Sequence, residues 1–212
     1  MRLEEDGKED SIFRRKYNIR MFVNRKEQKM GKKFGIKEVV AMGIGTALFV
    51  VLTTVQIPIG IPNTALQVRA AVLAFMSAVY GPVVGGVIGF AGHALGDAVF
   101  YGGVWWSWVF PDALFGIVVG LFVKKFAITT GGFDKAKMIL FNIVQVVGNA
   151  LAWIVLAPVL DILIYAEAPG KVFLQGAGAF LGNIIIVGVL GTLIGAVYSK
   201  TGAKNSSLQK ED

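Results

Sequence analysis

The chain has 212 residues, of which 55% are hydrophobic and only 17% are charged. Its mean hydropathy is +0.64, and this composition excludes an ordinary water-soluble domain of the same length. The absence of cysteine excludes disulfides, thiolate metal sites and cysteine nucleophiles. A net charge of +7 is compatible with nucleic-acid binding, but the basic residues are placed as membrane topology requires, so no nucleic-acid partner is expected.

Charge and hydropathy divide the chain into three regions. Residues 1–36 are rich in Lys and Arg and are predicted to be a basic, partly disordered cytoplasmic extension. Residues 37–199 are predicted to form a transmembrane domain, because long uncharged stretches alternate there with short breaks. Residues 200–212 are again polar and are expected to be a cytoplasmic tail.

Six apolar segments lie in the central region, each close to the ~20 residues that a helix needs to cross a bilayer core of ~30 Å. In chain order they are residues 38–56, 66–80, 82–100, 106–123, 138–158 and 176–198. Glycine and proline separate them, as Gly81 and Pro82 do between the second and third segments. The predicted fold is therefore an all-α integral membrane protein with six transmembrane helices.

Lys and Arg predict the orientation of these helices. If the N-terminus is cytoplasmic, all but two of the 21 basic residues lie on the inside, and only Arg69 and Lys171 lie outside. Such a bias follows the positive-inside rule. Both termini and the loop at residues 124–137 are therefore predicted to be cytoplasmic.

Polar side chains of several predicted helices fall at one depth, in the outer half of the membrane. Polar groups in hydrocarbon cost free energy, so their gathering predicts a cavity that opens outward. Nearby tryptophans offer flat faces for stacking on an aromatic or heterocyclic solute. The predicted substrate-binding residues are His93, Asp97, Trp105, Trp108, Asp112, Asn149 and Asn183.

Structural alternatives remain open for the same residues. The tryptophans at positions 105–108 also fit an aromatic belt at the membrane interface. His93 also fits a core histidine bonded to a neighbouring carbonyl or to Asp97, four residues later. Both aspartates also fit ion pairs with Arg69 that would hold helices together.

Small residues recur at a spacing of four on several predicted helices, for example Gly43 and Ala47 on the first and Gly85 and Gly89 on the third. Such pairs let helices approach closely, either inside the bundle or against a partner. Catalytic motifs such as Gly-x-Ser-x-Gly, His-Glu-x-x-His and the phosphate-binding loop are absent, so no enzyme is predicted. One histidine with separated carboxylates provides too few ligands for a metal site, so none is predicted.

Three stretches together resemble a known family. They are residues 37–48, residues 80–86 and residues 92–97 leading into the tryptophan-rich segment. Over about residues 30–200 the chain resembles the substrate-binding S components of energy-coupling factor (ECF) vitamin transporters. The resemblance is greatest to a branch that groups riboflavin- and hydroxymethylpyrimidine-type S components with a family whose solute is unassigned.

The resemblance implies an importer subunit of the bacterial plasma membrane. It would capture a small heteroaromatic vitamin or precursor outside and deliver it inward with a transmembrane coupling subunit and two ATPases, which hydrolyse ATP, while binding no cofactor itself. The loop after the first helix would gate the site, through Pro58, Pro62, Asn63 and Gln67. The small residues Ala41, Gly43 and Ala47 would face the coupling subunit, although the family's usual Ala-x-x-x-Ala motif is here Gly43-x-x-x-Ala47. A stand-alone secondary transporter or channel for a small polar solute is the alternative, although the sequence shows no convincing inverted repeat.

Overall fold

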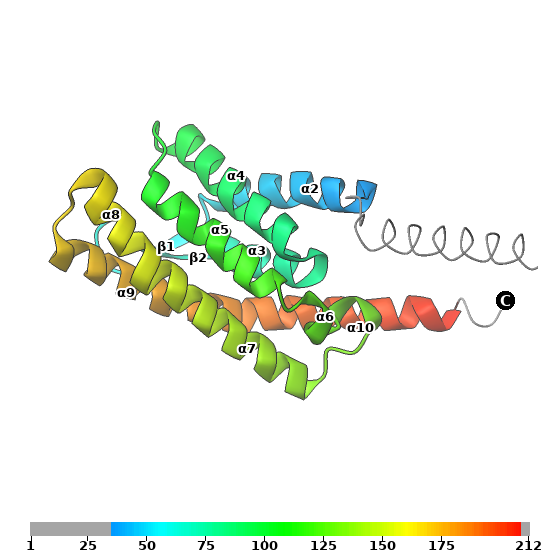
Figure 1. The fold of residues 1–212 in the computed structure, drawn as a ribbon. Helices are drawn as coiled ribbons and strands as arrows, with labels where there is room; N and C mark the ends of the chain where they lie inside the picture. Colours follow the sequence, from blue (N-terminus) through cyan, green and yellow to red (C-terminus); the bar gives the residue numbers. More distant parts are fainter. Residues whose placement is uncertain (1–34, 209–212) are drawn as a thin grey trace, which may run out of the picture. The chain divides into compact units, whose positions relative to one another are not determined.

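The computed structural model describes residues 35–208, and the predicted regions 1–36 and 200–212 therefore fall largely outside it or at its edge. From Glu38 onward the described residues belong to one compact unit. It is predominantly helical (Figure 1). The main helices are α2 Ile36–Leu52, α3 Arg69–Tyr80, α4 Pro82–Phe100, α5 Trp106–Gly120, α7 Lys135–Asn149, α8 Ala157–Tyr165, α9 Pro169–Ile186 and α10 Thr192–Leu208.

Short elements connect these helices. The four-residue helix α6 Val123–Phe126 and the 3₁₀ turn η1 Ile128–Thr130 follow α5. Two π-helical segments, η2 Ala150–Leu156 and η3 Val187–Gly191, join α7 to α8 and α9 to α10, so that two long continuous helices result. Asp134 caps the start of α7, where its carboxylate accepts a hydrogen bond from the Lys137 N–H at 3.0 Å, and this bond lowers the pKa of Asp134.

Three helices of the described residues are long and apolar enough to cross a membrane, which confirms a helical membrane protein, while the count of six spans stays a prediction. The three helices are residues 82–100, 135–165 and 169–201. A fourth candidate arises if α5 and the segment Val123–Thr130, bent by 51° against each other, count as one span. Helix α3 is apolar but has only 12 residues, and α2 has 17, because the polar loop between them occupies more chain than the hydropathy pattern predicts.

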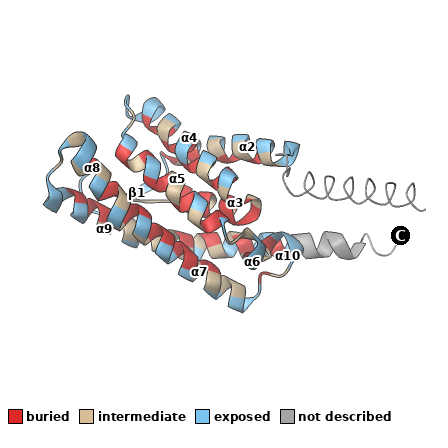
Figure 2. Cartoon of the chain, viewed as in Figure 1, coloured by how far each residue is buried: buried red, intermediate tan, exposed pale blue. Residues whose placement is uncertain are grey.

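Helices α4 and α5 lie side by side (Figure 1) and approach each other through glycines. A Cβ atom added to Gly85 would lie 2.5 Å from the carbonyl oxygen of Gly116, and one added to Gly89 would lie 2.6 Å from the carbonyl carbon of Asp112. Only glycine permits such backbone contact, so the four-residue spacing on α4 is used for internal packing. Figure 2 shows the buried residues on the facing sides of the helices and exposed residues on their outer sides.

A two-stranded antiparallel hairpin interrupts the helices, which the all-α prediction missed. Strand β1 Gln56–Pro58 pairs with β2 Ala65–Gln67, with Ile57 opposite Leu66. The hairpin lies against α9, where Cβ atoms added to Gly178 and Gly182 would meet Ile61 and Leu66. The predicted helix over residues 66–80 therefore begins only at Arg69.

Candidate functional site

A cavity of about 750 Å³ lies among the hairpin, α4, the segment before α5, and the helices α8 and α9. This volume is within the range of about 300–1,000 Å³ typical of small-molecule sites. A second cavity of about 20 Å³ lies beside it, and residues such as Arg69 and Trp108 line both. Three loops border the large cavity, at residues 59–64, 101–105 and 166–168.

His93 stands between two carboxylates beside the cavity. Its Nδ1 atom lies 2.6 Å from Asp112 Oδ2, and its Nε2 atom lies 3.5 Å from Asp97 Oδ1. All three side chains are buried, with 2–7% of their surface exposed. The glycine contact between Gly89 and Asp112 brings α5 close enough to α4 for this cluster to form. His93 therefore lies next to Asp97, as one of the structural alternatives predicted, and also contacts Asp112.

Asp161 on α8 holds two tryptophans in place. Its carboxylate accepts hydrogen bonds from Trp105 Nε1 at 2.7 Å, from Trp108 Nε1 at 2.8 Å, and from the Ser107 hydroxyl. Asp161 is 3% exposed. An ionised carboxylate has only acceptor atoms and all three partners are donors, so each of these buried polar groups has a hydrogen-bond partner. The same carboxylate therefore fixes two aromatic walls of the cavity.

Arg69 lies at the start of α3 and is almost completely buried. Its Nη1 donates to Thr53 Oγ1 at 3.0 Å, its Nε donates to Gln67 Oε1, and its guanidinium lies 4.7 Å from the centre of the Phe49 ring. Among the described residues, no carboxylate lies within salt-bridge distance of this guanidinium. The alternative in which Arg69 pairs with the aspartates is therefore not what the structure shows.

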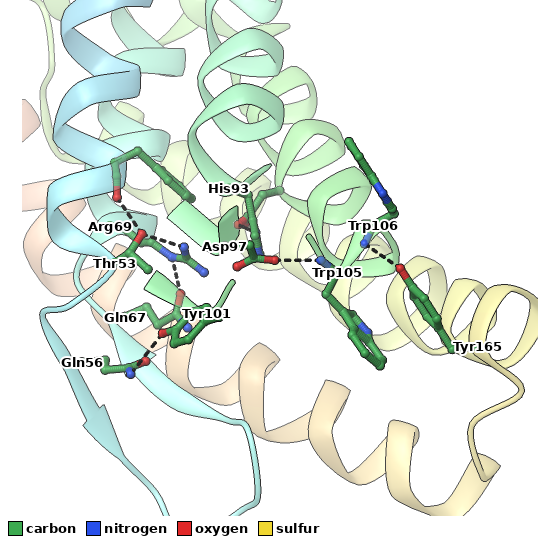
Figure 3. A network of polar contacts seen from close by, with 12 residues as sticks. Thr53, Gln56, Gln67, Arg69, His93, Asp97, Tyr101, Trp105, Trp106 and Tyr165 are labelled. Carbon is green, nitrogen blue, oxygen red and sulfur yellow. Dashed lines mark hydrogen bonds and ion pairs between the residues drawn. The ribbon is translucent and has the colours of Figure 1, made fainter. Parts of the chain in front are cut away.

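The rim of the cavity is aromatic, with Tyr101, Trp105 and Tyr165 among its side chains (Figure 3). These residues are more exposed than His93 and Asp97 at its floor. Trp105 stacks on Tyr165 with 4.1 Å between ring centres, and the Trp106 N–H donates to the Tyr165 hydroxyl at 3.0 Å. Across the opening, Gln56 Nε2 donates to the Tyr101 hydroxyl at 3.3 Å. Single hydrogen bonds of this kind between exposed side chains hold the surrounding loops only weakly.

The predicted site residues fall into three groups. His93, Asp97, Trp105 and Trp108 line the large cavity, Asp112 and Asn183 line the small one, and Asn149 lines neither. The amide of Asn149 is fully buried and donates to the backbone carbonyl and side-chain oxygen of Gln145 at 3.0 and 3.1 Å. Trp106 also lies away from the cavity and packs against Phe90.

The predicted gating residues lie on the hairpin and its turn. Pro58, Asn63 and Gln67 line the large cavity. The carbonyl of Pro62 accepts a hydrogen bond from Gln175 Nε2 at 2.8 Å, which ties the turn to α9. Asn63 has a positive φ of 57°, which asparagine tolerates better than most residues.

The three predicted partner-facing residues do not share one face of α2. Gly43 and Ala47 are exposed, and a Cβ atom added to Gly43 would meet nothing within 4 Å. Ala41 is 4% exposed and belongs to the core. Exposed apolar side chains of Val40, Ile44 and Leu48 surround the two small residues.

Sequence reasoning missed Asp161 and Tyr165 because it ended the fifth helix at residue 158. A usable signal was present, since Asp161 is the only charged residue between residues 138 and 166 and has an aromatic residue four positions later. Among the described residues, no group of three His, Cys, Asp or Glu side chains is arranged to hold a metal ion.

Comparison with known proteins gives one consistent result. Residues 33–200 match the family described as "ECF-type riboflavin transporter, S component". A UPF0397 protein of an Exiguobacterium species is 49% identical over 179 residues, covering 84% of this chain and 98% of the relative. UPF0397 proteins of Streptococcus gordonii and Lactobacillus gasseri are 49% and 45% identical, covering 84% and 85% of this chain and 96% and 98% of the relatives. No solved structure matches the chain.

Proposed function

The chain belongs to the family of ECF-type riboflavin transporter S components, and we propose on that premise that it binds a small heteroaromatic vitamin or vitamin precursor outside the cell. Members of this family are substrate-binding subunits of vitamin transporters, so the chain is a membrane transport protein and not a member of an enzyme family.

The observation that carries the proposal is the aromatic cavity with its buried carboxylates. Trp105, Trp108 and Tyr101 offer ring faces on which a flat solute stacks. Polar groups such as Asp97 and Gln175 offer acceptors and donors at the edges of such a ring. This combination of apolar walls and a few fixed polar groups suits a small heterocycle.

Charge narrows the class of solute. Four carboxylates surround the large cavity, Asp97, Asp161 and Glu167 in its lining and Asp112 bonded to His93, against three basic side chains, Arg69, Lys171 and His93. Lys171 is itself paired with Glu167 at 2.7 Å. The remaining excess of negative charge disfavours a phosphorylated or carboxylated solute, so we propose a neutral or cationic ring.

Delivery of the solute to the cytoplasm needs partner subunits, which the resemblance to the family implies. We propose that a coupling subunit docks on the exposed face of α2 around Gly43 and Ala47, and that two ATPases drive the cycle. Both positions lie on a surface that no described residue covers. Small exposed residues permit close approach of a partner helix.

For topology we propose six membrane-crossing helices in a bacterial plasma membrane, with both termini in the cytoplasm. The distribution of Lys and Arg supports this orientation. The loops around the large cavity, at residues 56–67, 101–105 and 166–168, are those that the orientation places outside. The cavity would therefore open to the medium.

The experiment is to purify the protein in detergent and identify any retained solute by mass spectrometry, then measure binding of riboflavin and hydroxymethylpyrimidine by calorimetry. Binding of a heteroaromatic solute is the expected result. Proteoliposomes with and without the coupling subunit and ATPases test delivery, and ATP-dependent uptake only with the partners is expected. Uptake by the isolated chain would instead favour the alternative, a secondary transporter or channel. Failure to retain or bind any heteroaromatic solute would overturn the proposal.

A further inference from the structure

Trp153 differs from the neighbouring tryptophan, Trp108, in its hydrogen bonding. Its side chain is buried, with 5% of its surface exposed, yet its Nε1 atom has no hydrogen-bond partner among the described residues. The indole nitrogen of Trp108, by contrast, donates to Asp161 at 2.8 Å. The two rings lie edge to face, with centres 5.9 Å apart. Buried donors in proteins are nearly always paired, so a free one beside a cavity calls for an explanation.

The position of Trp153 points to a ligand. Trp153 lines the small cavity of about 20 Å³ together with Asp112 and Asn183. A space of about 10–15 Å³ on this measure holds one water molecule. The small cavity therefore accepts one polar atom at the edge of a solute whose ring lies in the large cavity, and it is too small for a ring.

The local backbone is also unusual. Trp153 lies in the π-helical segment η2, which departs from the regular hydrogen bonding of the two helices that it joins. Short π-helical segments inside α-helices are frequent at functional sites. Gly176 on α9 meets the backbone carbonyl of Trp153, so the ring's attachment point is held against a neighbouring helix.

The charges around the small cavity restrict the kind of solute atom that can bind there. One carboxylate, Asp112, which is bonded to His93, and one guanidinium, Arg69, line it. An anionic group would face Asp112, whereas a carbonyl oxygen or an unprotonated ring nitrogen accepts a hydrogen bond without bringing charge.

We propose that the Trp153 indole N–H is the donor of a deep subsite that binds an uncharged acceptor atom, a carbonyl oxygen or a ring nitrogen, of the heteroaromatic solute. The inference rests on the proposed function. In this arrangement Trp153 recognises the edge of the solute, whereas Trp108 and Trp105 form walls of the large cavity.

The test compares Trp153→Phe with Trp108→Phe, which trims the same ring at a tryptophan whose N–H is bonded. Melting of the solute-free protein and affinity for riboflavin and hydroxymethylpyrimidine are measured for both. Trp153→Phe should lower the melting temperature less than Trp108→Phe, because only the second change breaks a hydrogen bond. It should weaken binding of the probe that the wild type binds by about three- to tenfold, as loss of one hydrogen bond predicts.

A second pair of variants removes the effect of ring size. Incorporation of 3-benzothienylalanine at either position keeps the bicyclic shape and replaces the N–H by sulfur. At position 153 the melting temperature of the solute-free protein should stay unchanged while affinity falls, and at position 108 the melting temperature should fall. Unchanged affinity at position 153, or a fall in melting temperature equal to that at position 108, would overturn the subsite. If the wild type binds neither probe and retains no solute, the proposed function fails and the subsite with it. Failure of the subsite alone leaves binding by the wild type intact.

Discussion

Replacing Asp161 by asparagine tests whether this carboxylate organises the site. The two indole groups of Trp105 and Trp108 and the hydroxyl of Ser107 all donate to it. Asparagine keeps one acceptor oxygen and places an NH₂ group where the second oxygen was, facing a donor. Oδ1 receives two of the bonds and Oδ2 receives the one from Trp108, so the best orientation of the amide still loses the Trp108 bond.

The magnitude follows from this count. A hydrogen bond to a charged group contributes about 1.5–3 kcal/mol, and leaving a buried donor unpaired costs about 1–3 kcal/mol. The two figures describe overlapping effects, so Asp161→Asn should lower the free energy of unfolding by about 2–3 kcal/mol. Because both tryptophans line the large cavity, solute affinity should fall as well.

Unfolding in mixed micelles, followed by tryptophan fluorescence, measures the change. Glu167→Gln is the matched control, since Glu167 also lines the cavity but pairs with the half-exposed Lys171. Such exposed pairs are worth about 0–1 kcal/mol. Combining Asp161→Asn with Trp108→Phe should cost less than the sum of the single changes, because both remove one interaction. If Asp161→Asn stays within about 0.5 kcal/mol of the wild type, a value usual for surface changes, the carboxylate does not hold the tryptophans.

Three further predictions concern helix packing, docking and topology. Gly89→Ala places a methyl group against the α5 backbone and should lower the free energy of unfolding by about 1–3 kcal/mol in the same assay. Gly43→Ala is the control, because its methyl group would contact no other atom within 4 Å, and it should cause no measurable loss of stability. Equal effects of the two changes would refute the glycine contact. Gly43→Leu should spare solute binding by the isolated chain but abolish ATP-dependent uptake with the partners, and loss of binding would show instead that this face of α2 packs internally. Cysteines introduced singly at Ser206 and Ala168 should react with an impermeant reagent from opposite sides of the membrane, and labelling of both in intact cells would refute the orientation.

Helix α4 shows what local signals determine. Its predicted range, residues 82–100, is the range observed, because Gly81 and Pro82 mark its start and Gly102 and Gly103 follow its end. Glycine and proline act through their own backbone preferences, so a single sequence reveals them. The family was likewise recognisable from short stretches and is confirmed by the matches.

The fifth helix shows where local signals mislead. The fifth apolar segment was predicted to end at residue 158, which is a proline and lacks the N–H that continues the hydrogen-bond ladder. In the structure η2 precedes it and α8 continues through it to Tyr165. A π-helical segment shifts the bonding pattern so that the missing donor is tolerated. The error removed Asp161 from the predicted helix and with it the main organising residue of the cavity.

The hairpin was missed for a different reason. Its strands have three residues each and carry no alternating pattern, and their pairing joins Gln56 to Gln67 across an intervening turn. Contacts between distant positions of this kind depend on the packing of the turn against α9, which no local pattern encodes. The family resemblance implied a gating role for this loop, whereas its hairpin form depends on tertiary structure.

The floor and the rim of the cavity are built differently, and this difference bears on transport. At the floor, backbone contact between α4 and α5 and the bond between His93 and Asp112 fix the polar groups within buried surroundings. At the rim, one hydrogen bond from Gln56 to Tyr101 joins the hairpin to the loop at residues 101–105, and both side chains are exposed. Segments held by few exposed interactions open at low cost in free energy, whereas close-packed interiors do not. We therefore propose that a solute passes the loops at the rim before it meets the polar groups at the floor, so that the floor discriminates between solutes and the rim controls access.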